Sequence, residues 1–179
     1  VTLDGSDDIW YNKNGEGLQI CFTKAYNNDN GMYDIIRDKL TWLIRNRPTK
    51  TFFEIGFGDN REICQCSDCK SAYKTYGESG VYLRFVNKLA NDIKVWKASN
   101  CPTKEVYLMA YAYHAFIEPP KGGVVAADNV IVRIAPITLD YSKAVNNSKN
   151  YYDDSWLSRT TWTEIFEGWS NVAANLAIW

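Results

Sequence analysis

The order of apolar segments along the chain limits what it can fold into. Five short apolar runs alternate with longer segments in which apolar residues recur at helical spacing. The runs are residues 18–23 (LQICFT), 51–57 (TFFEIGF), 106–113 (VYLMAYAY), 129–137 (NVIVRIAPI) and 176–179 (LAIW). Strands that alternate with helices pack as parallel βαβ units. We therefore predict an α/β fold with about five parallel strands.

Three segments have the apolar spacing of amphipathic helices, at residues 31–46, 80–96 and 161–174. Two connections between the predicted strands lack this helical spacing. Pro119-Pro120 and Gly122-Gly123 mark a turn-rich link before the fourth strand, where we expect no full helix. Residues 138–160 are polar and aromatic without a period, which predicts a long loop.

Alternation along the strands predicts a polar inner face. If Phe53, Ile55 and Phe57 face the helices, Glu54 faces the other way. The same parity places these residues inward: Gln19, Cys21, Thr23, Met109, Tyr111, Tyr113, Arg133 and Ala135. This polarity favours a partial (β/α)8 barrel of the TIM type over a flavodoxin-like sheet. Because five strands cannot close a barrel of eight, we expect residues 1–179 to be a single-domain fragment of a barrel from a longer protein.

Composition and motifs narrow the class of function. The 20 basic and 21 acidic residues give a net charge of −1, which argues against nucleic acid as a partner. Since no apolar run reaches the roughly 20 residues of a bilayer span, we predict no membrane span. The phosphate-loop, dinucleotide, zinc-protease and serine-hydrolase patterns do not occur in the sequence. Aromatic residues make up 15% of the chain, which suits either sugar stacking or a large core.

Four cysteines are predicted to meet at one end of the strands. Cys21 lies near the end of the first run, and Cys64, Cys66 and Cys69 form a C-x-C-x-x-C pattern after the second. Loops that follow parallel strands share one face, whereas Cys101 follows a helix and is placed at the opposite end. The four thiols suit a tetrahedral Zn²⁺ site, and they equally suit two disulfides. Either arrangement is structural, so no cofactor is required for chemistry.

Three stretches carry a resemblance to a known family. They read GDNREICQCSDCKSAYKTYGESGVYLRFVNKLANDI, YLMAYAYHAFIEPPK and DNVIVRIAPI. Their order resembles an uncharacterised family of secreted, Bacteroides-type bacterial proteins that occurs beside carbohydrate-binding and sugar-hydrolase modules. That family is similar to (β/α)-barrel glycoside hydrolases such as α-glucuronidases and hexosaminidases. The resemblance implies a secreted or periplasmic protein with a glycan substrate.

Glycoside hydrolysis needs two carboxyl groups, and three residues at the predicted strand ends could take part. Asp59 ends the second strand, although an Asx turn is an equally good role for it. Asp140 follows the fourth strand and would otherwise be a solvated loop acid. His114 is the only histidine and suits proton transfer or hydrogen bonding to a hydroxyl. Hexosaminidases have an Asp-Glu pair where this chain has Asp59-Asn60.

The remaining candidates surround these residues. The predicted substrate-binding residues are Asn60, Tyr111, Tyr113, Tyr141 and Trp179. Glu54 and Arg133 share the inner face and are predicted to form a structural ion pair. We predict that these groups form the site of a glycoside hydrolase that acts on a polysaccharide or glycan. The alternatives are a non-catalytic carbohydrate-binding barrel and an accessory half-barrel that pairs with the rest of its own chain.

Overall fold

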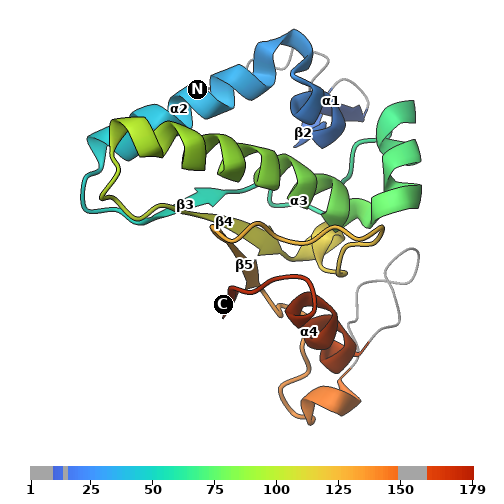
Figure 1. The fold of residues 1–179 in the computed structure, drawn as a ribbon. Helices are drawn as coiled ribbons and strands as arrows, with labels where there is room; N and C mark the ends of the chain where they lie inside the picture. Colours follow the sequence, from blue (N-terminus) through green and yellow to red (C-terminus); the bar gives the residue numbers. More distant parts are fainter. Residues whose placement is uncertain (1–9, 14–15, 149–160) are drawn as a thin grey trace.

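The centre of the fold is a parallel sheet of four strands. Figure 1 labels β3, β4 and β5 of this sheet. The computed structural model describes residues 10–13, 16–148 and 161–179. The strands lie in chain order: β3 (Phe52–Ile55), β4 (Tyr107–Ala112), β5 (Val130–Ile134) and β6 (Leu176–Ile178). This confirms an α/β fold in which parallel strands alternate with helices. The arrangement is consistent with part of an α/β barrel, and four strands do not close one.

The first predicted strand, residues 18–23, is not part of this sheet, so the count of five parallel strands is wrong. β2 (Glu16–Ile20) pairs antiparallel with β1 (Trp10–Lys13) instead. The chain then enters α1 (Phe22–Asn27), with Cys21 as its N-cap. The inward strand positions predicted for Cys21 and Thr23 are therefore wrong as well. A six-residue apolar run does not distinguish a strand from a strand that ends in a helix turn.

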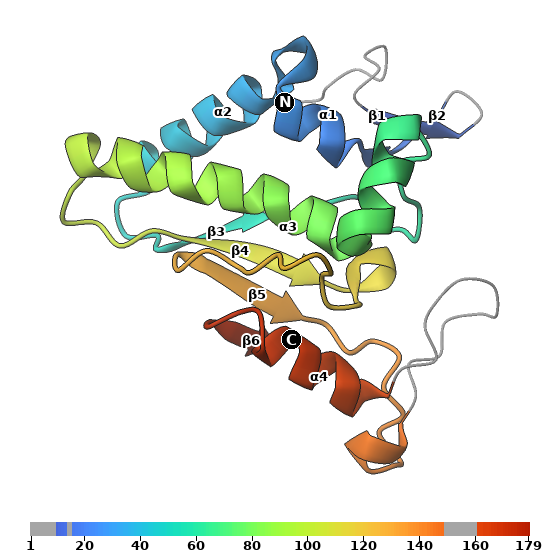
Figure 2. The ribbon, with the colours of Figure 1, turned by 45° about the vertical axis from the view of Figure 1, so that its right-hand side comes forward.

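The helices between the strands differ in length from the prediction. α2 spans Met32–Asn46 and α4 spans Trp162–Ser170, close to the expected ranges. α3 spans Ser67–Asn100 and so begins well before residue 80. It turns sharply at Gly77, where φ is +72°, as Figure 2 shows. The Tyr76 carbonyl there accepts a hydrogen bond from the Lys121 backbone N–H at 2.8 Å, so the break leaves that group satisfied.

The links that follow β4 and β5 contain little helix. After β4 there is one 3-10 turn, η2 (His114–Phe116), and after β5 another, η3 (Val145–Asn147), precedes α4. The absence of a full helix between β4 and β5 confirms the prediction from the proline and glycine pairs. Part of the predicted loop 138–160 lies outside the described residues. No helix in the described part of the chain is long and apolar enough to cross a membrane.

One face of the sheet is covered by helix α3, which runs across β3 and β4 in Figures 1 and 2. Phe53, Leu108 and Val132 point to this face and are buried. Tyr82 and Phe85 of α3 form an aromatic cluster with Phe22 and Phe116. The Tyr82 hydroxyl donates to the Ile55 carbonyl and accepts from the Tyr111 N–H at 3.1 Å, which ties β3 to β4.

The other face carries the alternate residues of the same strands, which are half-buried or exposed. Strand register places Glu54 beside Met109, and Tyr111 beside Arg133. The polar side chains predicted for an inner face thus do share one face. Burial alternates residue by residue along β3, β4 and β5, as expected when only one side of a sheet is covered.

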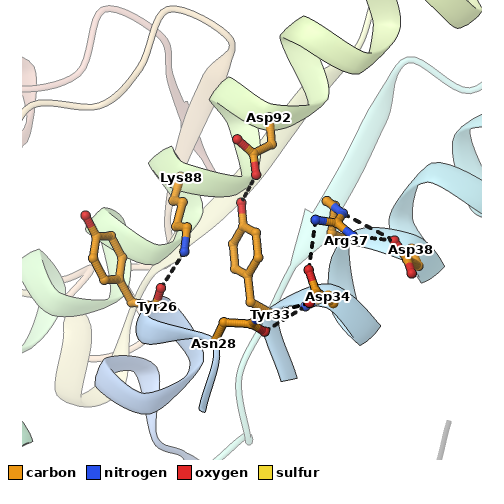
Figure 3. A network of polar contacts seen from close by, with 8 residues as sticks. All are labelled: Tyr26, Asn28, Tyr33, Asp34, Arg37, Asp38, Lys88 and Asp92. Atoms are coloured by element: carbon orange, nitrogen blue, oxygen red, sulfur yellow. Dashed lines mark hydrogen bonds and ion pairs between the residues drawn. The ribbon is translucent and has the colours of Figure 1, made fainter. Parts of the chain in front are cut away.

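A polar network fixes α1 and α2 to the long helix (Figure 3). The Tyr33 hydroxyl donates to Asp92 at 2.6 Å, and the Lys88 ammonium donates to the Tyr26 carbonyl at 2.6 Å. Burial and the Asp92 carboxylate raise the pKa of Tyr33, which keeps this hydroxyl a donor. The network holds the helix that directly follows β2, so the end of β2 has a fixed place beside α3.

Candidate functional site

Asp59 and His114 meet at the ends of two adjacent strands. Asp59 follows β3, His114 follows β4, and His114 Nε2 lies 3.0 Å from Asp59 Oδ1. The Asp59 side chain is 85% exposed, whereas that of His114 is 16% exposed. Parallel strands end at the same edge of a sheet, which explains how residues 55 positions apart come together. The structure therefore brings together two of the three predicted catalytic residues.

His114 has an unusual backbone conformation for a residue with a side chain. Its φ is +50°, in the left-handed region. This conformation costs a non-glycine residue on the order of 1 kcal/mol or more, and such residues cluster at functional sites. The conformation turns the chain out of β4 and into η2 at the point where the imidazole meets Asp59. The sequence gives no sign of it, because a histidine at a strand end is not specific.

Aromatic rings continue from His114 along the sheet edge. The Tyr113 ring lies 4.5 Å from the imidazole and stacks on Phe57 at 4.9 Å. Tyr111 contacts Tyr113 at 6.1 Å and Trp179 at 6.4 Å between ring centroids. We call Asp59, His114, Tyr113, Tyr111 and Trp179 the strand-end strip. It crosses from β3 to β6 as a continuous line of contacts, and Trp179 at its far end is 67% exposed.

Glu54 and Arg133 border the strip on the uncovered face. Arg133 Nη1 lies 3.9 Å from Glu54 Oε1, a long separation for an ion pair. The Arg133 guanidinium also lies 5.1 Å from the Trp179 ring. The Glu54 side chain is 56% exposed, so this carboxylate on the predicted inner face is in contact with solvent. Partial burial, together with Glu54, raises the pKa of Tyr111, which keeps its hydroxyl protonated at neutral pH.

Asp140 and Tyr141 lie in a different environment. The Asp140 carboxylate accepts from the Ser142 hydroxyl at 2.6 Å and pairs with Lys143 at 2.6 Å. The hydrogen bonds from Lys143 and Ser142 lower the pKa of Asp140 to about 2. Tyr141 is 78% exposed. These contacts belong to the loop itself, as in the solvated-acid interpretation, and the catalytic role of Asp140 stays a prediction.

Asn60 takes the turn-forming role that the sequence also allowed for Asp59. Its side-chain oxygen accepts from the Glu62 N–H at 2.9 Å, an Asx turn. Asp59 therefore contacts His114 with its carboxylate. The side-chain oxygen of Asn60, a predicted substrate-binding residue, accepts a hydrogen bond within the loop.

The four cysteines predicted to meet do so at the junction of β2, the loop after β3 and the start of α3. Cys21, Cys64, Cys66 and Cys69 have all Sγ atoms within 4.8 Å of one another. Cys21 Sγ lies 3.8 Å from Cys66 Sγ and 3.5 Å from Cys69 Sγ. The Cys69 thiol is also 3.0 Å from the Thr23 hydroxyl. These four close thiols can bind a metal ion.

The close thiols shift one another's pKa in opposite directions. Hydrogen bonds from Cys21 and Cys64 lower the pKa of Cys69. Hydrogen bonds with Cys64 and Cys69, together with burial, raise the pKa of Cys21. Cys69 lies in the first turn of α3, where the helix dipole also favours an anion.

Sequence reasoning missed the role of Gln19. This residue is fully buried, and its side chain contacts the backbone of the loop after β3. The one available signal was a polar amide within the apolar run LQICFT. A buried amide needs partners, but the sequence does not say that they come from residues 58–62.

The fold and the sites define an α/β protein with a four-stranded parallel sheet, a strip of polar and aromatic groups at the strand ends, and a four-thiol cluster at the end of the loop after β3. The chain belongs to the family described as a domain of unknown function (DUF4838), whose match covers residues 9–179. No curated protein and no solved structure matches the chain.

Proposed function

We propose that the strand-end strip binds a glycan and that the protein is a glycoside hydrolase-like, carbohydrate-active domain. The observation that carries this proposal is the continuous line of contacts from Asp59 through His114, Tyr113 and Tyr111 to Trp179. Flat aromatic faces pack against the apolar faces of sugar rings, while carboxylate, imidazole and guanidinium groups bind their hydroxyls. The nearly neutral net charge suits a neutral ligand.

The strip also offers groups for hydrolysis. Asp59 is exposed and accepts a hydrogen bond from its neighbour His114 when Nε2 carries the proton. Glu54, exposed on the same sheet, is a second carboxyl group for the pair that glycosidases use. Asp140 remains a third candidate. We propose Asp59 as the first residue to test, because it alone of the three contacts the histidine.

Binding is tested with a panel of soluble plant and bacterial polysaccharides, by affinity electrophoresis and then calorimetry. Trp179→Ala should weaken binding about tenfold or more, the size expected for loss of one stacked ring. Trp42→Ala is the matched control, because Trp42 is 52% exposed but lies on α2. Unchanged affinity in Trp179→Ala, or an equal loss in both variants, would contradict the proposal.

Catalysis is separated from binding by Asp59→Asn and Asp140→Asn. Loss of turnover in Asp59→Asn with retained binding supports the enzyme. Parallel loss of binding supports the alternative of a non-catalytic carbohydrate-binding domain. If neither variant nor wild type binds any glycan, the accessory half-barrel remains. Export to the cell exterior or periplasm, implied by the family resemblance, is part of the same proposal.

We also propose that the four-thiol cluster binds Zn²⁺ rather than forming two disulfides. A tetrahedral site with Zn–S bonds of about 2.3 Å needs sulfurs roughly 3.8 Å apart, whereas a disulfide needs about 2.05 Å. The separations of 3.8 and 3.5 Å from Cys21 fit the first arrangement. The Cys69 N–H points to Cys66 Sγ at 3.4 Å, a donor that stabilises a metal-bound thiolate. Four soft sulfur ligands favour zinc among the common divalent metals.

Metal analysis of the purified protein tests this proposal. We expect about one zinc per chain, lost in Cys69→Ser and retained in Cys101→Ser. Cys101 is the matched control because it lies beyond the other end of α3. A metal-free protein whose intact mass is 4 Da below that of the reduced chain would show two disulfides instead.

A further inference from the structure

The loop that carries Asp59 is held from both ends by the end of β2. At the near end, Gln19 Oε1 accepts from the Gly58 N–H at 2.9 Å, and Gln19 Nε2 lies 3.3 Å from the Gly58 carbonyl oxygen. Gln19 Nε2 is also 3.4 Å from the Glu62 carbonyl oxygen. At the far end, Cys21 lies among the thiols that close the loop at Cys64 and Cys66. Gln19 in β2 and Cys21, directly after the strand, therefore hold the two ends of the loop.

The position of Asp59 depends on this backbone, because its side chain is too exposed to be held by packing. Gly58, directly before it, has both backbone groups bonded to Gln19. Asn60, directly after it, donates its N–H to the Gly58 carbonyl at 2.8 Å and caps Glu62. Gln19 thus holds Gly58 directly, and it holds Asn60 indirectly through Gly58 and Glu62, which Gln19 also contacts.

We propose that Gln19 is a positioning residue that holds Asp59 against His114, and that metal binding by the four thiols fixes the other end of the same loop. The Asp59–His114 contact should then respond to changes at Gln19 and at the metal, neither of which touches the strand-end strip. The consequence for glycan binding rests on the function proposed above. The effect on the contact itself does not.

The single histidine makes the contact measurable without any glycan. In tag-free protein the imidazole of His114 gives one Cε1–Hε1 cross-peak in a ¹H–¹³C spectrum. Asp59→Asn sets the size of the shift that follows loss of the carboxylate. Gln19→Met keeps the length of the side chain and removes its hydrogen bonds. We expect its cross-peak to move in the same direction as that of Asp59→Asn, and at least half as far.

The matched control is Gln65→Met. Gln65 lies in the same loop but is exposed, so this variant should leave the cross-peak at the wild-type position. A folded Gln19→Met protein with a wild-type His114 signal would overturn the proposal, and so would an Asp59→Asn variant with no shift. If Gln19→Met does not fold, wild type stripped of metal by a chelator is the second measurement.

The effect of the metal on the His114 signal is measured separately. Stripping should move the His114 cross-peak toward the Asp59→Asn position, and added Zn²⁺ should restore it. An unmoved signal in protein shown to have lost its metal would overturn the coupling of the cluster to the site. In proteins that act on or bind a glycan, Gln19→Met should change turnover and affinity in the same direction as Asp59→Asn does. Absence of all glycan binding would reject the proposed function while leaving the spectroscopic result to decide the positioning role.

Discussion

The two faces of the sheet differ sharply although they are made from alternate residues of the same strands. On the face under α3, Leu108, Val130 and Val132 are completely buried. On the opposite face, Glu54, Tyr111 and Arg133 are exposed or half-buried. Burial of apolar area drives folding, whereas exposed polar and aromatic groups contribute little to it. Stability therefore depends mainly on the covered face, and the uncovered face is the one to which we assign the proposed ligand recognition. Substitutions of adjacent residues on one strand test this division.

The largest effect is expected from a neighbouring pair on β4. Leu108→Ala removes a fully buried side chain from under α3 and should lower the free energy of unfolding by about 2–5 kcal/mol. Met109→Ala, one residue later on the other face, should cost less than about 1 kcal/mol because Met109 is only half-buried. Urea unfolding followed by tryptophan fluorescence measures both. Equal losses would mean that both faces are covered in solution.

The same alternation explains how much of the fold could be predicted. The short apolar runs identified β3, β4, β5 and β6, and alternation along the strands placed Glu54, Tyr111 and Arg133 on one face. The run at residues 18–23 failed because its apolar residues serve a strand end and a helix start. The kink in α3 could not be placed either, since it depends on Lys121 supplying a hydrogen bond from a distant loop.

The part of the site that could be predicted consists of residues that directly follow parallel strands. Parallel pairing brings Asp59 and His114 to one edge, and it brings the cysteine pattern close to that edge. Two features of the site leave no pattern in the sequence. The left-handed backbone of His114 follows from the local turn, and the clamp by Gln19 follows from how β2 packs on the loop. Asp140 also follows a strand, as the prediction required, yet its carboxylate forms an ion pair with Lys143 in the same loop.

A smaller effect should separate the backbone of His114 from its side chain. Glycine adopts a φ of +50° without strain, whereas alanine does not, so His114→Gly should be more stable than His114→Ala by roughly 1 kcal/mol. Both variants remove the imidazole and should weaken glycan binding equally. Urea unfolding measures the stability difference, and calorimetry measures the binding.

The control for His114 is the same pair of substitutions at Asn91, an exposed position in α3. In a helix, glycine is less favourable than alanine by roughly 1 kcal/mol, so the sign of the difference should reverse there. The same sign at both positions would show that His114 does not hold the left-handed conformation in solution.

The smallest effect is expected at Asp140, in the loop after β5. Its pKa is lowered to about 2 by Lys143 and Ser142, while an unfolded aspartate titrates near a pH of about 4. The stabilisation is therefore fully present above a pH of about 4 and is lost as the pH falls toward 2. Because the Asp140 side chain is 33% exposed and water screens its ion pair, the free-energy difference between wild type and Asp140→Asn should be small at neutral pH and should shrink across that window. Urea unfolding at several pH values measures this free-energy difference, which should be smaller in a Lys143→Met background.

A difference that grows on acidification would mean that the carboxylate form of Asp140 destabilises the fold. That behaviour is expected of a catalytic acid and not of a paired loop residue.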